Sequence, residues 1–186
     1  MKVLKWILIV LAVLSLLFFF VLSPYMRTQT KKHSPETTVV YTKNGMDLSV
    51  TYSSPSKKDR VIFGELVPYD AVWRTGANEP TTFSTANDIK IAGKNLPAGT
   101  YSLWTRPSRQ SWSVIFNKNI PEWGVTILSG GKETTRVLEE DVVEIEIPTE
   151  QIAETVENFT IDFDQQKELY MRISWDRTRV KVPISK

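Results

Sequence analysis

Apolar and polar residues alternate with a period of two through much of the chain after residue 45, and this pattern limits the possible folds. It occurs in six segments: 46–52, 112–116, 143–147, 159–163, 169–175 and 180–184. Because successive side chains of a β-strand point to opposite faces, each segment would present one apolar face and one polar face. Strands of this kind form antiparallel sheets with one face buried. No segment of useful length beyond Thr38 has the period of a helix, so an all-β domain is predicted.

Turn-forming residues separate these segments. Asn44-Gly45 is typical of a tight hairpin, Gly93–Gly99 of a compact reversal, and Ser129–Lys132 of a further turn. About eight to ten short strands over about 150 residues predict an antiparallel β-sandwich, for which a jelly roll is one available topology. A short helix is expected either at residues 68–72 or at residues 149–154, the second of which follows a proline.

A separate apolar run occupies residues 6–22, where Ser15 is the single polar residue. As a helix this run would span about 25 Å, close to the thickness of the hydrocarbon core of a bilayer. A cleaved signal peptide is the alternative, because Lys2 and Lys5 form a suitable basic n-region. The run is long for such a peptide, however, and no A-x-A-like cleavage site follows it. The sequence therefore predicts an uncleaved transmembrane signal anchor over 6–22, a polar tether over 23–37 and a domain over 38–186.

Charge is unevenly distributed along the chain. Residues 1–35 contain five lysines and arginines and no acidic residue. The remainder holds 18 lysines and arginines against 21 acidic residues, so it lacks the basic surface of a nucleic-acid-binding domain. The chain has no cysteine and one histidine, His33, which lies in the predicted tether. Disulfides, zinc sites built from Cys and His, and a Ser-His-Asp triad are therefore not expected, and neither a metal nor a cofactor is predicted.

The run Trp73–Glu79 combines an aromatic ring, a cation, a turn glycine, an amide and a carboxylate. Two interpretations of this mixture are open. In the structural one, Trp73 belongs to the core and Arg74 forms an ion pair with Glu79. Gly76 then supplies a positive φ, and Asn78 caps backbone groups.

In the functional interpretation, the same run is the floor of a ligand cleft. A tryptophan ring would stack on a sugar-like ring while polar side chains bind its hydroxyl groups. The candidate ligand-binding residues are Trp73, Arg74, Asn78, Glu79, Tyr101 and Trp104. A hydrolase would instead need paired carboxylates, and the acids near the run have no recognisable spacing: Asp59, Glu65, Asp70 and Glu79. No catalytic residue is predicted.

Six runs of this chain, in order, resemble the bacterial domain-of-unknown-function 2911 family: Val50–Ser53, Arg60–Gly64, Leu66–Tyr69, Val72–Glu79, Leu96–Tyr101 and Trp112–Asn117. The resemblance covers about residues 47–184 and weakens after Gly124. It implies an extracytoplasmic all-β domain, and it implies no particular reaction.

The resemblance also implies export, which decides between the two possible orientations of the apolar run. The flanking cations are nearly balanced, with Lys2 and Lys5 before the run and three after it. Residues 1–5 are then cytoplasmic, and a single pass through Trp6–Leu22 holds the C-terminal domain in the periplasm at the inner membrane. The predicted function is a non-enzymatic interaction or accessory role in a cell-envelope assembly, with another envelope protein as partner. A glycan or small-ligand binding module is the alternative, ahead of a hydrolase.

Overall fold

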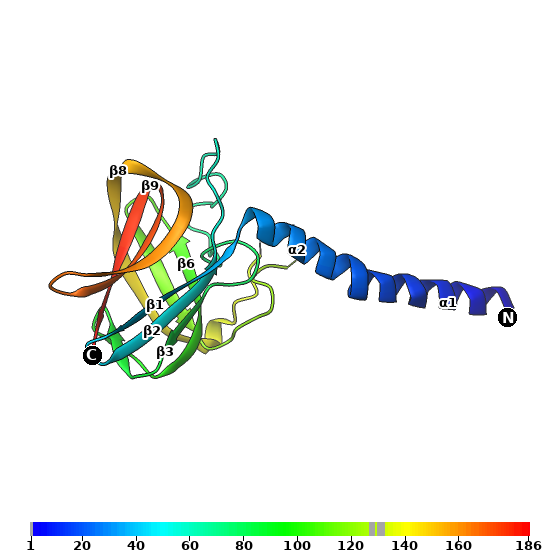
Figure 1. Cartoon of the computed structure of the whole chain (residues 1–186), viewed down its shortest axis with the longest axis horizontal. Coiled ribbons are helices and arrows are strands. Elements are labelled where there is room, and N and C mark those ends of the chain that lie inside the picture. The colour runs from blue at the N-terminus through cyan, green and yellow to red at the C-terminus, as the bar shows by residue number, and fades with distance from the viewer. Residues whose placement is uncertain (1, 127–128, 130–132) are drawn as a thin grey trace. The chain divides into compact units, whose positions relative to one another are not determined.

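A computed structural model describes residues 2–126, 129 and 133–186 of the chain. They form two compact units, of which the first ends at His33 and the second runs from Ser34 to Lys186. The first unit is helical and the second is built from β-strands (Figure 1). The turn predicted at Ser129–Lys132 falls mostly outside the described residues.

The first unit is a continuous helical run of α1 (Lys2–Leu17), the π-helical turn η1 (Phe18–Leu22) and α2 (Ser23–His33). In η1 the N–H of Ser23 donates to the carbonyl of Phe18, five residues earlier. Pro24 follows directly. Because proline has no N–H and its ring clashes with the carbonyl four residues back, a regular α-turn cannot pass through it unchanged. The wider π turn accommodates the proline without ending the helix.

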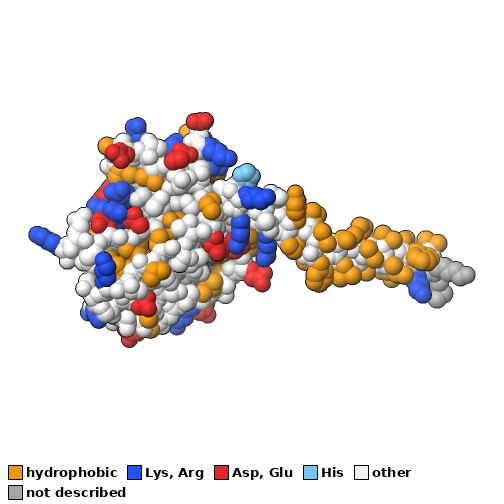
Figure 2. Space-filling model, in the orientation of Figure 1, with side chains coloured by type: hydrophobic (Ala, Val, Ile, Leu, Met, Phe, Trp, Pro, Cys, Tyr) orange, Lys and Arg blue, Asp and Glu red, His pale blue; other side chains and the backbone are white. Residues whose placement is uncertain are grey.

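Apolar side chains are exposed along the N-terminal helical run and cover its visible side in Figure 2. By length and composition, the helix Val3–His33 could cross a membrane. A helix that is apolar around its circumference has no face suited to water. The predicted N-terminal apolar helix is therefore present, and its role as a signal or an anchor is considered below.

The sequence predicts a polar tether over residues 23–37, whereas residues 23–33 form α2 in the structure. The last turn of α2 holds Lys31, Lys32 and His33. Cations at this end of a helix interact favourably with the negative end of its dipole, which helps a polar segment continue the helix begun by the apolar run. Two residues, Ser34 and Pro35, separate α2 from the first strand.

The β unit contains nine strands among its described residues. They are β1 (Glu36–Lys43), β2 (Met46–Ser53), β3 (Thr82–Thr85), β4 (Ile89–Ile91), β5 (Lys94–Leu96), β6 (Gly99–Pro107), β7 (Ser111–Asn117), β8 (Asp141–Gln165) and β9 (Leu169–Ser185), with a short 3-10 turn η2 (Leu138–Glu140) before β8. Their order in the sheet is β1-β2-β3-β6-β7-β8-β9-β4-β5, and neighbouring strands pair antiparallel. The all-β antiparallel prediction is confirmed.

The predicted sandwich has two separate sheets, whereas the structure has a single sheet that does not close. The sheet is single because β8 pairs with β7 on one side and with β9 on the other. The first part of β8, Asp141–Pro148, pairs with β7, and its second part, Thr149–Gln165, pairs with β9. The 25 residues of β8 also include 149–154, so this segment is strand rather than the helix considered above. The other expected helix, at 68–72, is a turn.

The apolar faces of the strands share one hydrophobic core. All six alternating segments contribute the residues that the period-two pattern predicts: Met46, Leu48, Val50, Tyr52, Trp112, Val114, Phe116, Val143, Ile145, Ile147, Phe159, Ile161, Phe163, Leu169, Met171, Ile173, Trp175, Val180, Val182 and Ile184. The edge strand β1 also meets the far part of β8, where the rings of Tyr41 and Phe163 lie 5.8 Å apart. The sheet thus curves until β1, at one edge, contacts β8, the sixth strand in the order of the sheet.

Candidate functional site

The run 73–79 lies in the connection between β2 and β3 and is bonded to neighbouring strands. The backbone of Trp73 exchanges two hydrogen bonds with Thr105 of β6, with N···O distances of 2.7 and 3.0 Å. Gly76 has a φ of 154°, and a Cβ at this position would lie 3.0 Å from the carbonyl oxygen of Ser53. Glycine therefore permits the close approach of this turn to β2, as the structural interpretation expects.

The ring of Trp73 lies at the edge of the core. It stacks on Trp175 with the centroids 6.1 Å apart and the planes at 16°, and it meets Phe159 edge to face at 5.0 Å. Its indole N–H donates to the carbonyl of Gly76 at 3.0 Å. These contacts use the ring for packing and its polar atom for holding the turn, which is the structural role.

Arg74 is a partly buried cation whose Nε is enclosed and has no hydrogen-bond partner among the described residues. Its Nε is buried with no hydrogen bond, and its side chain takes part in no ion pair that the described residues show. The structural interpretation of the sequence paired Arg74 with Glu79, and Arg74 does not form this ion pair. Burial lowers the pKa of the Arg74 guanidinium, because loss of water disfavours its charged form. Gly124 covers the side chain so closely that a Cβ there would lie 2.7 Å from the Arg74 Cδ.

Asn78 is buried and holds the first residue of the β unit. Its Nδ2–H donates to the carbonyl of Ser34 at 3.3 Å. This contact matches the capping role in the structural interpretation, and it joins residues that are 44 positions apart. Glu79 follows and is partly buried.

Tyr101 and Trp104 are three positions apart on β6 and therefore lie on opposite faces of the sheet. Tyr101 faces the core, and its hydroxyl donates to the carbonyl of Pro97 at 2.8 Å. Burial first, and then the charge of Asp88, raises the pKa of Tyr101. Trp104 is fully buried on the other face. The six candidate residues are thus not brought together around one cleft.

Comparison with known families agrees with this architecture. The family described as "Protein of unknown function (DUF2911)" matches residues 34–184. This chain belongs to the DUF2911 family. The matched region begins at the first residue of the β unit, so the helical unit lies outside the DUF2911 domain. Neither a curated protein nor a solved structure gives a match to the chain.

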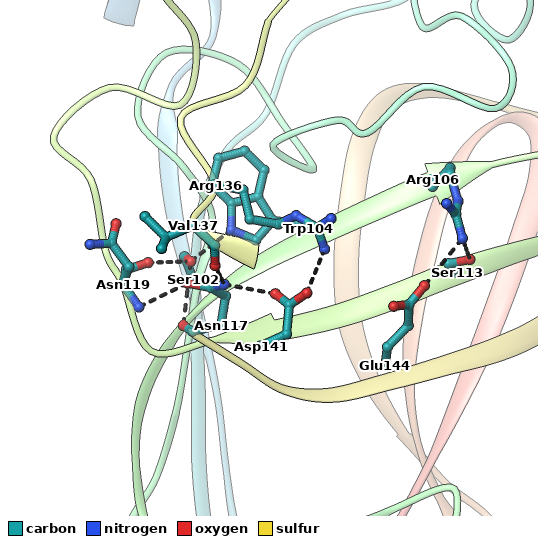
Figure 3. Close-up of polar contacts among 10 residues, drawn as sticks. All are labelled: Ser102, Trp104, Arg106, Ser113, Asn117, Asn119, Arg136, Val137, Asp141 and Glu144. Carbon is teal, nitrogen blue, oxygen red and sulfur yellow. Dashed lines mark hydrogen bonds and ion pairs between the residues drawn. The ribbon is translucent and has the colours of Figure 1, made fainter. Parts of the chain in front are cut away.

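The DUF2911 domain contains a polar cluster that the sequence did not predict, on the outer face of β6 and β7 (Figure 3). At its centre, Nδ2 of Asn117 donates to Asp141 Oδ1 at 2.7 Å and to the carbonyl of Val137 at 2.6 Å. Asp141 Oδ2 also accepts from Arg136 Nη1 at 2.9 Å, and the Arg136 side chain is 9% exposed. We call this group, with Ser102, Trp104 and Asn119, the Asn117 cluster.

The Asn117 cluster explains why Trp104 is buried on an outer face. Trp104 Nε1 donates to Ser102 Oγ at 2.7 Å, and Ser102 Oγ donates to the carbonyl of Asn119 at 2.6 Å. One feature of the sequence indicates this arrangement. Trp104 lies on the same face of β6 as Ser102 and Arg106, and a tryptophan among polar residues indicates that other parts of the chain cover this face. Because its groups bond to one another, the cluster joins the chain on either side of 127–132 to the sheet.

Three of the four acids near the candidate run are exposed: Asp59, Glu65 and Asp70, in the connection between β2 and β3. Among the described residues, no group of three or more His, Cys, Asp and Glu side chains has an arrangement that could hold a metal ion.

Proposed function

We propose that this DUF2911 protein is a single-pass inner-membrane protein whose β domain lies in the periplasm and acts without catalysis, by contact with another cell-envelope protein. In this proposal the domain is a β-sandwich, because the open sheet curves until β1 contacts β8. The hydrolase alternative is not favoured, since three of the four acids considered for it, Asp59, Glu65 and Asp70, are exposed.

Two aromatic residues support an uncleaved anchor over a cleaved signal peptide. Trp6 and Tyr25 are both exposed on the helix, nineteen positions apart. That separation corresponds to about 28 Å along a helix, close to the thickness of a hydrocarbon core. Tryptophan and tyrosine favour the two interfaces of a bilayer. The continuation of the helix through α2 also leaves Pro24, next to the expected cleavage region, inside regular structure.

The observation that carries the interaction function is an exposed apolar patch at the end of the sheet. Ile120, Val137 and Leu138 are exposed, with Leu138 at 62%. Their segments adjoin, because Lys118 N–H donates to the carbonyl of Glu140 at 2.9 Å. We call these three residues the Leu138 patch. Apolar side chains that gather on a charged surface are typical of a protein-binding site. On the visible face of the domain, charged side chains of both signs are interspersed with apolar ones (Figure 2).

A photoreactive amino acid at position 138 should form a discrete adduct with one envelope protein in intact cells. The matched control is position 40 on β1, where Val40 is 59% exposed but lies outside the patch. The adduct at 138 should withstand alkaline washing of the membranes, and its intact mass should include residues 1–24. Equal adducts at both positions, or none at 138, would count against the interaction. A shortened mass would count against the anchor.

A second candidate function is binding of a small ligand at the Trp73–Glu79 run, and Arg74 is the observation that favours it. Buried donors in folded proteins are nearly always hydrogen-bonded, so a buried Nε without a partner needs an explanation. A ligand carboxylate or phosphate would supply the missing acceptor, and arginine binds both with paired hydrogen bonds. With Asn78, Tyr101 and Trp104 buried, the partly buried Arg74 is the candidate residue best placed to reach such a ligand.

Replacing Arg74 with methionine should raise the free energy of unfolding by about 1 kcal/mol, because it removes a desolvated charge that no carboxylate compensates. Chemical denaturation measures this change. Thermal shifts with acetate, citrate and phosphate then test the site, since any stabilisation of the parent should be absent from Arg74→Met. Arg109→Met is the control, because Arg109 lies over the ring of Tyr69 at 5.0 Å, outside the run. A clear loss of stability in Arg74→Met would show that the guanidinium is structural.

A further inference from the structure

The long β8–β9 hairpin bends back so that distant parts of the same two strands face one groove. The pairing of β8 with β9 is irregular between Gln151 and Val156 and again between Val156 and Thr160. Opposite this irregular stretch, Asp176 of β9 has a φ of 54°. Both features bend a strand pair. In Figure 1 the hairpin accordingly curls over, with its tip in orange at the left.

Seven residues line this groove, which has a volume of about 320 Å³. Three come from the tip of the hairpin and four from its base: Asp164, Gln166 and Tyr170, and Ile147, Pro148, Glu150 and Lys181. The volume is at the lower end of the range for small-ligand pockets. We call this hollow the hairpin groove.

The hairpin groove combines an aromatic ring with polar groups that are already oriented. The hydroxyl of Tyr170 donates to Glu168 Oε2 at 2.7 Å, which holds the ring in place. On the opposite wall, Lys181 Nζ lies 3.1 Å from Glu150 Oε1. Asp164 Oδ2 accepts from Gln166 Nε2 and from Arg172 Nη1, each at 3.2 Å. The groove therefore contains both donor and acceptor groups beside an aromatic ring.

Carboxylates outnumber cations in and around the groove. Glu150, Asp164 and Glu168 are joined by Asp162, which binds Arg172 through both oxygens at 2.7 and 2.8 Å. The cations are Arg172, Lys181 and Lys167, which lies at the hairpin tip beside Glu168. The excess of one negative charge favours a neutral or cationic ligand over an anionic one.

We propose that the hairpin groove binds a saccharide, either neutral or amino-substituted. A pyranose ring has an apolar C–H face that fits against the Tyr170 ring and the exposed ring of Pro148. Its hydroxyl groups both donate and accept, so they can bond to carboxylates, an amide and an ammonium group in one site. The acidic excess selects a protonated amino group and disfavours a uronic acid. This site is separate from the Leu138 patch and from Arg74, so it extends the proposed function without depending on it.

A larger groove of about 610 Å³ lies beside the same hairpin tip and is a weaker candidate for a sugar. It is lined by the turn after β1, the turn between β4 and β5, and the last residues of β9. Its described lining contains no aromatic side chain, and its apolar floor of Met46, Leu169 and Ile184 is almost fully buried. It therefore offers no flat ring on which a pyranose could stack.

The test uses isothermal titration calorimetry to measure how tightly three soluble oligosaccharides bind to the full chain in lipid nanodiscs. The probes are the glucosamine tetramer, the N-acetylglucosamine tetramer and trigalacturonate. The glucosamine tetramer should bind most tightly and trigalacturonate most weakly. Tyr170→Ala should weaken glucosamine binding about tenfold or more, because the stacking platform is lost. Glu150→Gln should weaken binding of the glucosamine tetramer more than that of its N-acetylated form.

Tyr69→Ala is the matched control, because Tyr69 is an aromatic residue outside the groove that pairs with Arg109. It should bind the tetramers as the parent does. Tyr170→Phe keeps the ring and should retain most of the affinity, so it separates loss of the platform from loss of the hydroxyl. The proposal is overturned if the parent binds none of the probes, if trigalacturonate binds most tightly, or if Tyr170→Ala and Tyr69→Ala weaken binding equally.

Discussion

Replacing Trp175 with alanine is expected to lower the free energy of unfolding of the β unit by about 3–5 kcal/mol. Trp175 is 1% exposed and lies at the centre of an aromatic cluster, stacked on Trp73 and edge to face with Phe159 at 5.7 Å. Its indole N–H also donates to the carbonyl of Glu157 at 3.2 Å. Alanine would leave a large cavity and an unpaired carbonyl. The loss would be a large share of the roughly 5–15 kcal/mol that stabilises a typical domain.

Denaturant titrations followed by far-ultraviolet circular dichroism would measure this loss, because that signal comes mainly from the backbone and the transition midpoint can be read in each variant. Trp175→Phe is the matched variant, since it keeps an aromatic ring in the same place. Its cost should be about 1–2 kcal/mol, from the smaller ring and the lost hydrogen bond. If alanine and phenylalanine cost the same, the cluster does not pack as the structure shows.

Asp141→Ala should be nearly as damaging, at about 3 kcal/mol, although Asp141 lies on the outer face of the sheet. Its carboxylate accepts from Arg136 and Asn117, and both partners would lose their acceptor in a largely buried setting. Removing one member of a buried ion pair leaves an uncompensated charge, which costs more than the pair itself contributes. Equilibrium denaturation of the purified chain measures the effect.

Asp162→Ala provides the comparison for this prediction. Asp162 and Arg172 form a contact through two hydrogen bonds, where Asp141 and Arg136 share one, but their side chains are 39% and 27% exposed. Water can replace the lost partner there, so the cost should be about 1 kcal/mol or less. A loss at Asp141 no larger than that at Asp162 would mean that the Asn117 cluster does not hold the chain on the outer face.

The strands could be predicted from the sequence because burial on a curved sheet is a local, period-two property. The apolar phase of Trp112–Phe116, for example, is also its core face. The helix considered at 149–154 shows the limit of local reasoning. A proline followed by Thr149 and Glu150 is a good helix start, yet Thr149 and Glu150 pair with Val180 and Arg179 of β9. Pairing across the sheet outweighs a local capping preference.

The candidate site was predictable in its residue types and not in its geometry. Tyr101 and Trp104 are an odd number of positions apart on one strand, so the alternation of side chains alone places them on opposite faces of the sheet. The role of Trp73 depends instead on Trp175, which lies 102 positions later. The Asn117 cluster likewise needs Asp141, 24 positions away, beside Asn117. No local pattern could place these partners.

By itself, the sequence determined the apolar N-terminal helix, the antiparallel β domain, the residues of its core and the family. All of these depend on periodicity, on length or on short runs of residues, which are properties of neighbours in the chain. Only the tertiary structure decided that β8 joins both halves of one sheet, that the Nε of Arg74 is buried without a partner among the described residues, and that the β8–β9 hairpin bends back to form a groove. Each of these depends on contacts between distant residues, which curvature and register of the sheet bring together.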